Sequence, residues 1–171
     1  MSFAERLLRH ASDIIPDLQN GDITDDVCLR RAVSASYYAL FHLINEDAVR
    51  ILAPNVTTET SYRIQRWFEH AKMKEICGRF LKEKLEQPLS GLIGDSASAH
   101  LQTVCRNFIT LQDARHAADY DQGYAIDRTE ALKHFASAVY AVAAWNRIKE
   151  TGEANIFILS LLLWKNWEKD R

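Results

Sequence analysis

The segment LQDARHAADYD, residues 111–121, gathers side chains that carry charge or move protons, with small alanines between them. On a helix Arg115 and Asp119 are i,i+4 neighbours. His116 is i,i+4 from Tyr120 and i,i+3 from Asp119, so the four side chains share one face. Arginine before aspartate is the weaker order for such an ion pair, so helix stabilisation alone explains it poorly. Two interpretations stay open: a reactive or binding site, and a polar seam that anchors the helix end.

A second polar cluster lies in YRIQRWFEHAK, residues 62–72. Arg63 and His70 are seven positions apart, which is two turns on one face of a continuous helix. Arg66 and His70 are i,i+4 neighbours on the same face. This cluster is either a solvated charged face or a second arginine–histidine site.

Arginine beside histidine is a suitable pair for metal-independent cleavage of RNA. A histidine with an ordinary pKa exchanges protons near neutral pH, and the planar guanidinium binds phosphate oxygens two at a time. Arg115 and His116 supply both groups, although adjacent helical residues diverge by about 100°. They would serve one substrate at a dimer cleft, where a symmetry axis brings two copies together. Arg63 and His70 are the alternative pair.

Metal and cofactor chemistry find no support in the residue spacings. The histidines form no HExxH pair and no Cys/His pair at zinc-finger spacing, and no ExxH pair occurs on two helices. The SGLIGDSAS segment has two glycines but no lysine for a phosphate-binding loop. We therefore expect no metal and no cofactor. The histidines are His10, His42, His70, His100, His116 and His134.

Composition and charge indicate a cytoplasmic protein. The net charge of −2 gives no basic footprint for strong nonspecific binding to nucleic acid. The odd count of three cysteines, with no CxxC pair, suits reduced thiols inside a cell. The opening MSFAERLLRHASD has no apolar secretory core. The longest apolar run, residues 156–164, is about half of the ~20 residues that a membrane-spanning helix needs, so we expect no membrane association.

The hydrophobic spacing predicts an all-α fold in a single domain, residues 1–171. Apolar residues recur at threes and fours, and no stretch alternates apolar with polar residues. Asp127 is the expected cap of the fifth helix and Gly152 its end, while 88–94 is the expected loop. We predict an antiparallel up-and-down bundle of four to five long helices plus a C-terminal apolar helix. The expected helices are 3–14, a long helix starting at Thr24-Asp25-Asp26 and ending at Pro54, 58–85 with a bend near its middle, 96–120, 127–152 and 153–171.

The C-terminal segment EANIFILSLLLWKNWEKDR is apolar nearly all round, so something must bury it. It packs on its own bundle, forms a dimer interface, or associates with a membrane. We expect a homodimer, to which this helix contributes.

Two segments together resemble the HEPN superfamily (higher eukaryotes and prokaryotes nucleotide-binding domains). RRAVSASYYALFHL, residues 30–43, resembles its Arg-Ala…Ser-x-x-Tyr-Tyr-Ala-x-Phe helix, and ARHAADYD resembles the Arg-x-x-x-Asp-Tyr sequence of one subgroup. The stretch RIQRWFEHAKMKEIC resembles the middle segment of that subgroup. We expect Tyr37, Tyr38 and Phe41 to be chiefly structural, with small residues between them allowing close approach of helices.

The resemblance implies a helical bundle, often dimeric. Many members are metal-independent ribonucleases, the toxins of toxin–antitoxin pairs, whose usual partner is a small nucleotidyltransferase-like protein; others are catalytically silent modules. In active members an arginine is followed after four to six residues by the catalytic histidine, but here Tyr120, Asp121 and Gln122 occupy those positions after Arg115. We therefore predict a noncatalytic component of a toxin–antitoxin or defence system that binds a nucleotide, RNA or protein. The alternative is a metal-independent ribonuclease toxin using Arg115 and His116, or Arg63 and His70.

Overall fold

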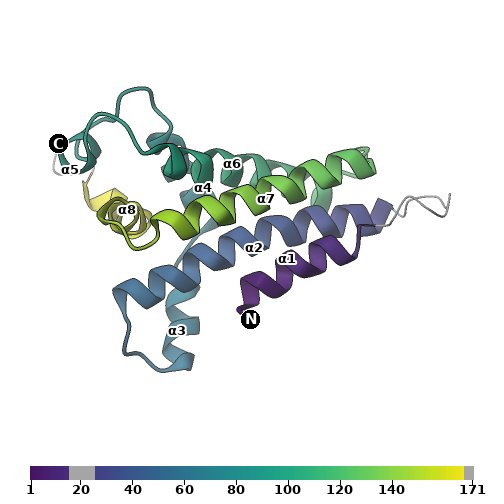
Figure 1. The fold of residues 1–171 in the computed structure, drawn as a ribbon, viewed down its shortest axis with the longest axis horizontal. Coiled ribbons are helices and arrows are strands. Elements are labelled where there is room, and N and C mark those ends of the chain that lie inside the picture. The colour runs from purple at the N-terminus through teal and green to yellow at the C-terminus, as the bar shows by residue number, and fades with distance from the viewer. Residues whose placement is uncertain (16–25, 168–171) are drawn as a thin grey trace. The chain divides into compact units, whose positions relative to one another are not determined.

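The computed structural model describes residues 1–15 and 26–167, with side chains up to residue 164. This part of the chain holds eight α-helices and no β-strand, which confirms the all-α helical bundle (Figure 1). The expected start of the long helix at Thr24 and Asp25 lies outside the described residues, as do residues 168–171 of the tail. The helices are α1 (Phe3–Asp13), α2 (Asp26–Leu52), α3 (Thr58–Gln65), α4 (His70–Phe80), α5 (Leu89–Ile93), α6 (Ala99–Tyr120), α7 (Arg128–Ile148) and α8 (Gly152–Trp167).

The chain forms two compact units. Unit 1 contains Met1–Leu43 and Asn107–Val142, and unit 2 contains Ile44–Arg106 and Ala143–Arg171. Helices α2, α6 and α7 each contribute residues to both units. The segment 111–121 therefore lies in unit 1, and the segment 62–72 lies in unit 2.

In unit 1, α2 and α6 run antiparallel. Arg30 near the start of α2 reaches Ala118 near the end of α6, at 3.0 Å from guanidinium to carbonyl oxygen. Tyr37, two turns further along α2, packs on Phe108, which lies earlier in α6, with ring centroids 5.5 Å apart. Residue numbers thus rise along one helix as they fall along the other, which gives the up-and-down arrangement expected from the sequence.

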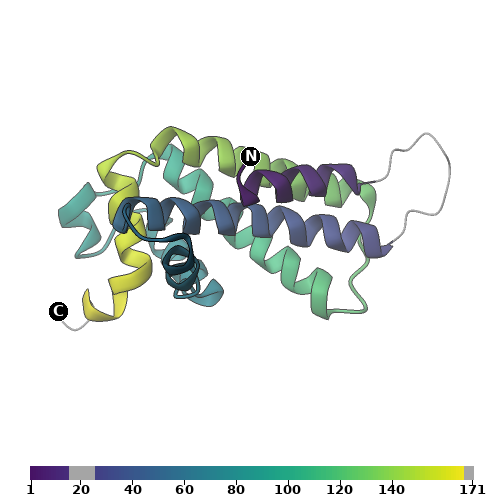
Figure 2. The ribbon, with the colours of Figure 1, turned by 90° about the horizontal axis from the view of Figure 1, so that it is seen from below.

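Helix α1 lies alongside α2, also antiparallel (Figures 1 and 2). The Phe3 ring at the start of α1 is 4.9 Å from the His42 ring of α2. Ile15, just beyond the end of α1, belongs to a buried apolar cluster with Leu29 of α2. This cluster joins all four helical segments of unit 1; its buried members are Ile15, Leu29, Ala32, Val33, Ala114, Ala118 and Ala131.

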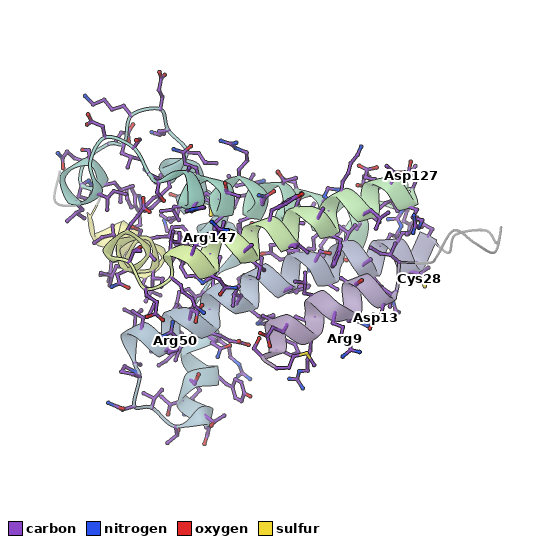
Figure 3. The ribbon with its side chains drawn as sticks, viewed as in Figure 1. Arg9, Asp13, Cys28, Arg50, Asp127 and Arg147 are labelled. Atoms are coloured by element: carbon purple, nitrogen blue, oxygen red, sulfur yellow. The ribbon has the colours of Figure 1, made fainter. Side chains whose placement is uncertain are left out.

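Side chains cap two helices of unit 1 at their first turns. The Glu5 amide donates to Ser2 Oγ at 3.1 Å and the Ser2 amide donates to Glu5 Oε2 at 2.7 Å, a reciprocal capping box. The Glu130 amide donates to Asp127 Oδ1 at 2.8 Å, which confirms the predicted cap of α7. Asp127 is labelled at the start of α7 in Figure 3.

Aromatic side chains form the core of unit 2. The Phe157 ring of α8 lies 5.3 Å from Phe80 of α4 and 6.0 Å from Trp145 of α7, both edge-on. The buried Trp145 indole N–H donates to Asp47 Oδ2 at 2.8 Å. Because a buried polar group costs free energy unless it is hydrogen-bonded, this contact satisfies both partners and fixes their positions.

Most of the apolar helix α8 is buried within unit 2, where it packs on α4 and α5. Leu163, by contrast, is 37% exposed, and Ile156 and Leu159 are half-buried. Among the described residues, no helix is long and apolar enough to cross a membrane. Of the three interpretations of the tail, burial on its own bundle accounts for most of its apolar surface. Among residues 152–164 of α8, the buried ones are Ala154, Phe157, Ile158, Ser160, Leu161 and Trp164.

The predicted helix 58–85 is two helices with a break at 66–69. The Arg66 amide bonds the Arg63 carbonyl at 3.3 Å, and the Trp67 amide bonds the Ile64 carbonyl at 2.9 Å. These i→i−3 bonds tighten the chain and close α3, in place of the i→i−4 bonds that would extend it. The expected bend is thus a full interruption, and α4 itself ends at Phe80.

Two sequence predictions at glycines were wrong. The expected loop 88–94 contains the short helix α5, which ends where Gly94 adopts φ 90°, a conformation that other residues rarely reach. Gly152 does not end the fifth helix. Helix α7 ends at Ile148 and Gly152 is the first residue of α8, because Thr151 Oγ1 accepts from the Ala154 amide at 3.2 Å and begins a new helix.

Candidate functional site: the α2–α6 seam

Five polar side chains form a seam between α2 and the end of α6: Arg30, Ser34, Tyr38, Arg115 and Asp119. Arg115 Nε lies 2.7 Å from Asp119 Oδ2, so the charge pair expected from the sequence is present. The N–H is not aligned with the carboxylate, so this contact is an ion pair without a proper hydrogen bond. Ser34 Oγ donates to the other carboxylate oxygen at 2.5 Å. Asp119 thus joins α6 to α2.

The Arg115 guanidinium is occupied on several sides. Its Nη2 donates to the Tyr38 hydroxyl at 2.7 Å. Its Cζ lies 5.3 Å from the ring centroid of Tyr38 and 5.3 Å from that of Tyr120, within cation–π range. Because only 19% of the Arg115 side chain is exposed, solvent screens these contacts less than those of a surface pair.

The surroundings of Arg115 favour its charged form. Partial burial by itself lowers the pKa of the guanidinium, but Tyr38, Asp119 and Tyr120 more than offset it and raise the pKa above its ordinary value. Arg115 is therefore a permanent cation with its counter-charge beside it. It can bind, and it cannot act as an acid or base.

Arg30 closes the end of α6. Its Nη1 donates to the carbonyl oxygens of Ala118 and Asp121, at 3.0 and 2.8 Å, and its Nη2 donates to Tyr124 at 2.5 Å. Its Nε pairs with Asp26 at 2.6 Å. The Ala118 carbonyl is in the last turn of α6, where carbonyls have no partner inside the helix, and the other two belong to the turn that follows. One arginine from α2 thus bonds the helix end and the next turn.

The two adjacent tyrosines of the SYYALF segment lie in different surroundings. Tyr37 is fully buried, with its ring 5.5 Å from Phe108 and 6.0 Å from Phe41. Tyr38 is half-buried and presents its hydroxyl to Arg115. Tyr37 therefore supports the seam from the core, and Tyr38 is part of the seam.

His116 and Tyr120 are exposed beside the seam. Their rings lie 5.0 Å apart, and Tyr120 is 66% exposed. His116 and Arg115 project in different directions from α6, as adjacent residues of a helix must. The segment 111–121 thus divides into a partly buried ionic pair and an exposed aromatic pair.

The second cluster is not brought together in the same way. Arg63 belongs to α3 and His70 is the first residue of α4, so the break between them removes the shared helical face that the spacing predicts. Arg63 Nη2 pairs with Glu59 at 2.7 Å on a surface where both side chains are more than 70% exposed.

Metal ligands do not gather in the part of the chain that the structure describes: no group of three or more His, Cys, Asp or Glu side chains there is placed to hold an ion. The three cysteines are free thiols. Burial raises the pKa of Cys105, and the neighbouring Cys77 raises it further, so this thiol stays protonated.

Comparisons of the chain with protein-family models, curated proteins and solved structures gave no match. The HEPN resemblance therefore stays a prediction.

Sequence reasoning missed two members of the seam. Arg30 had one signal, its i,i+4 spacing from Asp26, but its three carbonyl partners lie about 90 positions away. Ser34 is the serine of the segment that resembles the HEPN helix, but its bond to Asp119 depends on how α2 and α6 are aligned and could not be predicted.

Proposed function

We propose that the protein is a noncatalytic, HEPN-like binding module whose ligand is an RNA or a nucleotide. One observation carries the proposal: the Arg115 guanidinium already has Asp119 and Tyr38 as partners, at 2.7 Å each. An arginine that assists phosphoryl transfer must offer its N–H groups to the substrate's oxygens. Here Nη2 donates to Tyr38 of α2 and Nε faces Asp119 of α6, so one edge of the guanidinium is engaged within the fold.

A phosphate that bound along the Nε–Nη2 edge of Arg115 would compete with Asp119 and Tyr38. Removing one partner of a shielded charge pair leaves the other without compensation, which costs far more than the pair itself contributes. No arginine precedes His116 with the four to six intervening residues that active HEPN members have. These facts support a structural Arg115 and a binding role for the exposed residues next to it.

The exposed His116–Tyr120 pair supports the choice of ligand. Unstacked bases bind on tyrosine and histidine rings, and such stacking is worth about 1–3 kcal/mol per base. Tyr120 also lies against the Arg115 cation, which holds its ring in place. A nucleobase stacked on Tyr120 would lie beside His116, which can donate to a sugar or phosphate oxygen.

Fluorescence anisotropy with labelled single-stranded RNA, and calorimetry with mononucleotides, test this proposal. Tyr120→Ala should weaken binding about tenfold through loss of stacking. Tyr140→Ala is the matched control, because Tyr140 on α7 is 67% exposed against 66% for Tyr120. Equal effects of the two substitutions, or binding only to a protein partner, would overturn the nucleic-acid ligand.

The biological setting follows from the resemblance alone. We propose a cytoplasmic homodimer in a toxin–antitoxin or defence system, with a small nucleotidyltransferase-like protein as partner. Light scattering of the full chain checks the dimer, since a monomer at micromolar concentration contradicts it. The ribonuclease alternative keeps one supporting observation, the exposed imidazole of His116.

A further inference from the structure

Unit 2 contains a cavity of about 410 Å³ that the seam does not involve. It is lined by Trp67, Glu69, Lys72, Leu161 and Leu162. Trp67 lies in the break between α3 and α4, Glu69 and Lys72 belong to the start of α4, and the two leucines come from α8. Small-molecule sites commonly enclose about 300–1,000 Å³, so the cavity has room for a compact ligand.

Trp67 gives this cavity an accessible aromatic wall. It is 66% exposed, whereas Trp145 and Trp164 are almost completely buried in the same unit. A tryptophan face is the most effective side-chain surface for a cation. Leu161 and Leu162 provide an apolar surface on the α8 side.

One carboxylate at the cavity, Glu69, takes no part in the ion pairs formed there. Lys72 Nζ pairs with Glu75 Oε2 at 3.0 Å, and Arg79 Nη2 pairs with Glu75 Oε1 at 2.9 Å. These hydrogen bonds from Arg79 and Lys72 lower the pKa of Glu75, so the three groups form a stable ionic set. Within the described residues, the exposed Glu69 side chain has no hydrogen bond or ion pair, not even to the helix that it precedes.

We propose that this cavity binds an organic cation: a guanidinium or primary ammonium on a short aliphatic chain. The cationic head lies over Trp67 and pairs with Glu69, and the aliphatic part packs against Leu161 and Leu162. An anion is the poorer fit, because Lys72 is held in its ion pair and only 16% of its side chain is exposed, whereas Glu69 is exposed. This site is independent of the nucleic-acid function proposed for the seam.

A ligand-observed NMR titration tests the proposal with three probes that share a butyl chain: butylguanidinium, neutral pentanamide and the pentanoate anion. Butylguanidinium should bind with a dissociation constant of about 1 mM or tighter. Pentanamide and pentanoate should bind at least about fivefold more weakly. Equal binding of the three probes, or no saturable binding of butylguanidinium at tens of millimolar, overturns the proposal.

Matched variants locate the binding. Glu69→Gln removes the charge and keeps the shape, and it should weaken butylguanidinium binding about fivefold. Glu83→Gln is the control, since Glu83 is exposed and does not line the cavity. Trp67→Leu should also weaken binding about fivefold, with circular dichroism showing unchanged folding. Unchanged affinity in both Glu69→Gln and Trp67→Leu places the cation elsewhere and contradicts the proposal.

The same titration distinguishes two sources of the cation. A Gly-Arg-Gly peptide that binds more tightly than butylguanidinium indicates a protein side chain as the natural ligand. Tighter binding of the free cation indicates a small amine or guanidine. Both results support a cation site, and neither depends on RNA binding at Tyr120.

Discussion

Arg115 and Arg63 make ion pairs of equal length in very different surroundings. Each arginine lies 2.7 Å from a carboxylate on its own helix, four positions away. The side chains of Arg115 and Asp119 are 19% and 29% exposed, whereas those of Arg63 and Glu59 are 72% and 77% exposed. Arg115 also bonds Tyr38 on another helix.

The difference shows that spacing along the helix decides whether an ion pair forms. Contacts with residues distant in sequence decide how much that pair stabilises the fold. A pair surrounded by water gains little, because solvent screens it and both side chains lose freedom. A pair shielded by a second helix cannot lose one member without leaving the other uncompensated. The contacts with Ser34 and Tyr38 place the Arg115 pair in the second class.

The largest loss of stability should come from removing the buried side chain that supports the seam from the core. Tyr37→Ala deletes a fully buried ring that packs on Phe41 and Phe108, and it should destabilise the protein by about 3–5 kcal/mol. Urea unfolding measures the loss. The exposed Tyr140→Ala should change stability by less than about 0.5 kcal/mol. Similar values for the two variants would show that Tyr37 is not a core residue.

Asp119→Ala tests the seam directly. It leaves Arg115 without its counter-charge and Ser34 without its acceptor, so we expect a loss of about 1–3 kcal/mol. A double-mutant cycle with Ser34→Ala should show coupling of about 0.5 kcal/mol or more, because both side chains share one hydrogen bond. Additive losses would mean that the Ser34–Asp119 bond does not form in solution.

His134 in unit 1 should make a third, smaller contribution to the free energy of unfolding, one that depends on pH. Burial lowers the pKa of His134, Glu130 acts in the opposite sense, and Lys133 lowers the pKa further. The folded state then binds fewer protons than the unfolded state, so this contribution is complete above about pH 6.5 and is lost as the pH falls towards the folded-state pKa. His134→Leu should flatten the decline of unfolding free energy below about pH 6.5, and an identical decline in both proteins would refute this.

The exposed pair should give the smallest effect. Glu59→Ala removes the partner of Arg63 and should cost less than about 0.5 kcal/mol, decreasing further at high salt. Thermal unfolding at low and high salt, compared with Asp119→Ala, provides the measurement. A loss as large as that of Asp119→Ala would remove the distinction between the two regions.

The helices and the local pair at Arg115 follow from the sequence because both depend on spacings of three and four residues. Asp127 and the buried Tyr37 were predictable for the same reason. Arg30 and Ser34 were not, because their partners come from a helix that is distant in sequence. The break at 66–69 contains no glycine or proline, and the helix at 89–93 contains a glycine. Glycine and proline are the usual sequence signals of a helix end, so they predicted neither place correctly.

Cleavage of RNA without a metal tests the central claim, that Arg115 is structural and the protein binds without catalysis. Purified protein is incubated with total cellular RNA in excess chelator, beside His116→Ala and Arg115→Lys variants whose folding is verified by circular dichroism. We predict intact RNA with the wild-type protein, no difference for His116→Ala, and reduced stability for Arg115→Lys. Cleavage by the wild-type protein that His116→Ala abolishes at unchanged stability would contradict the account and identify the end of α6 as a ribonuclease site.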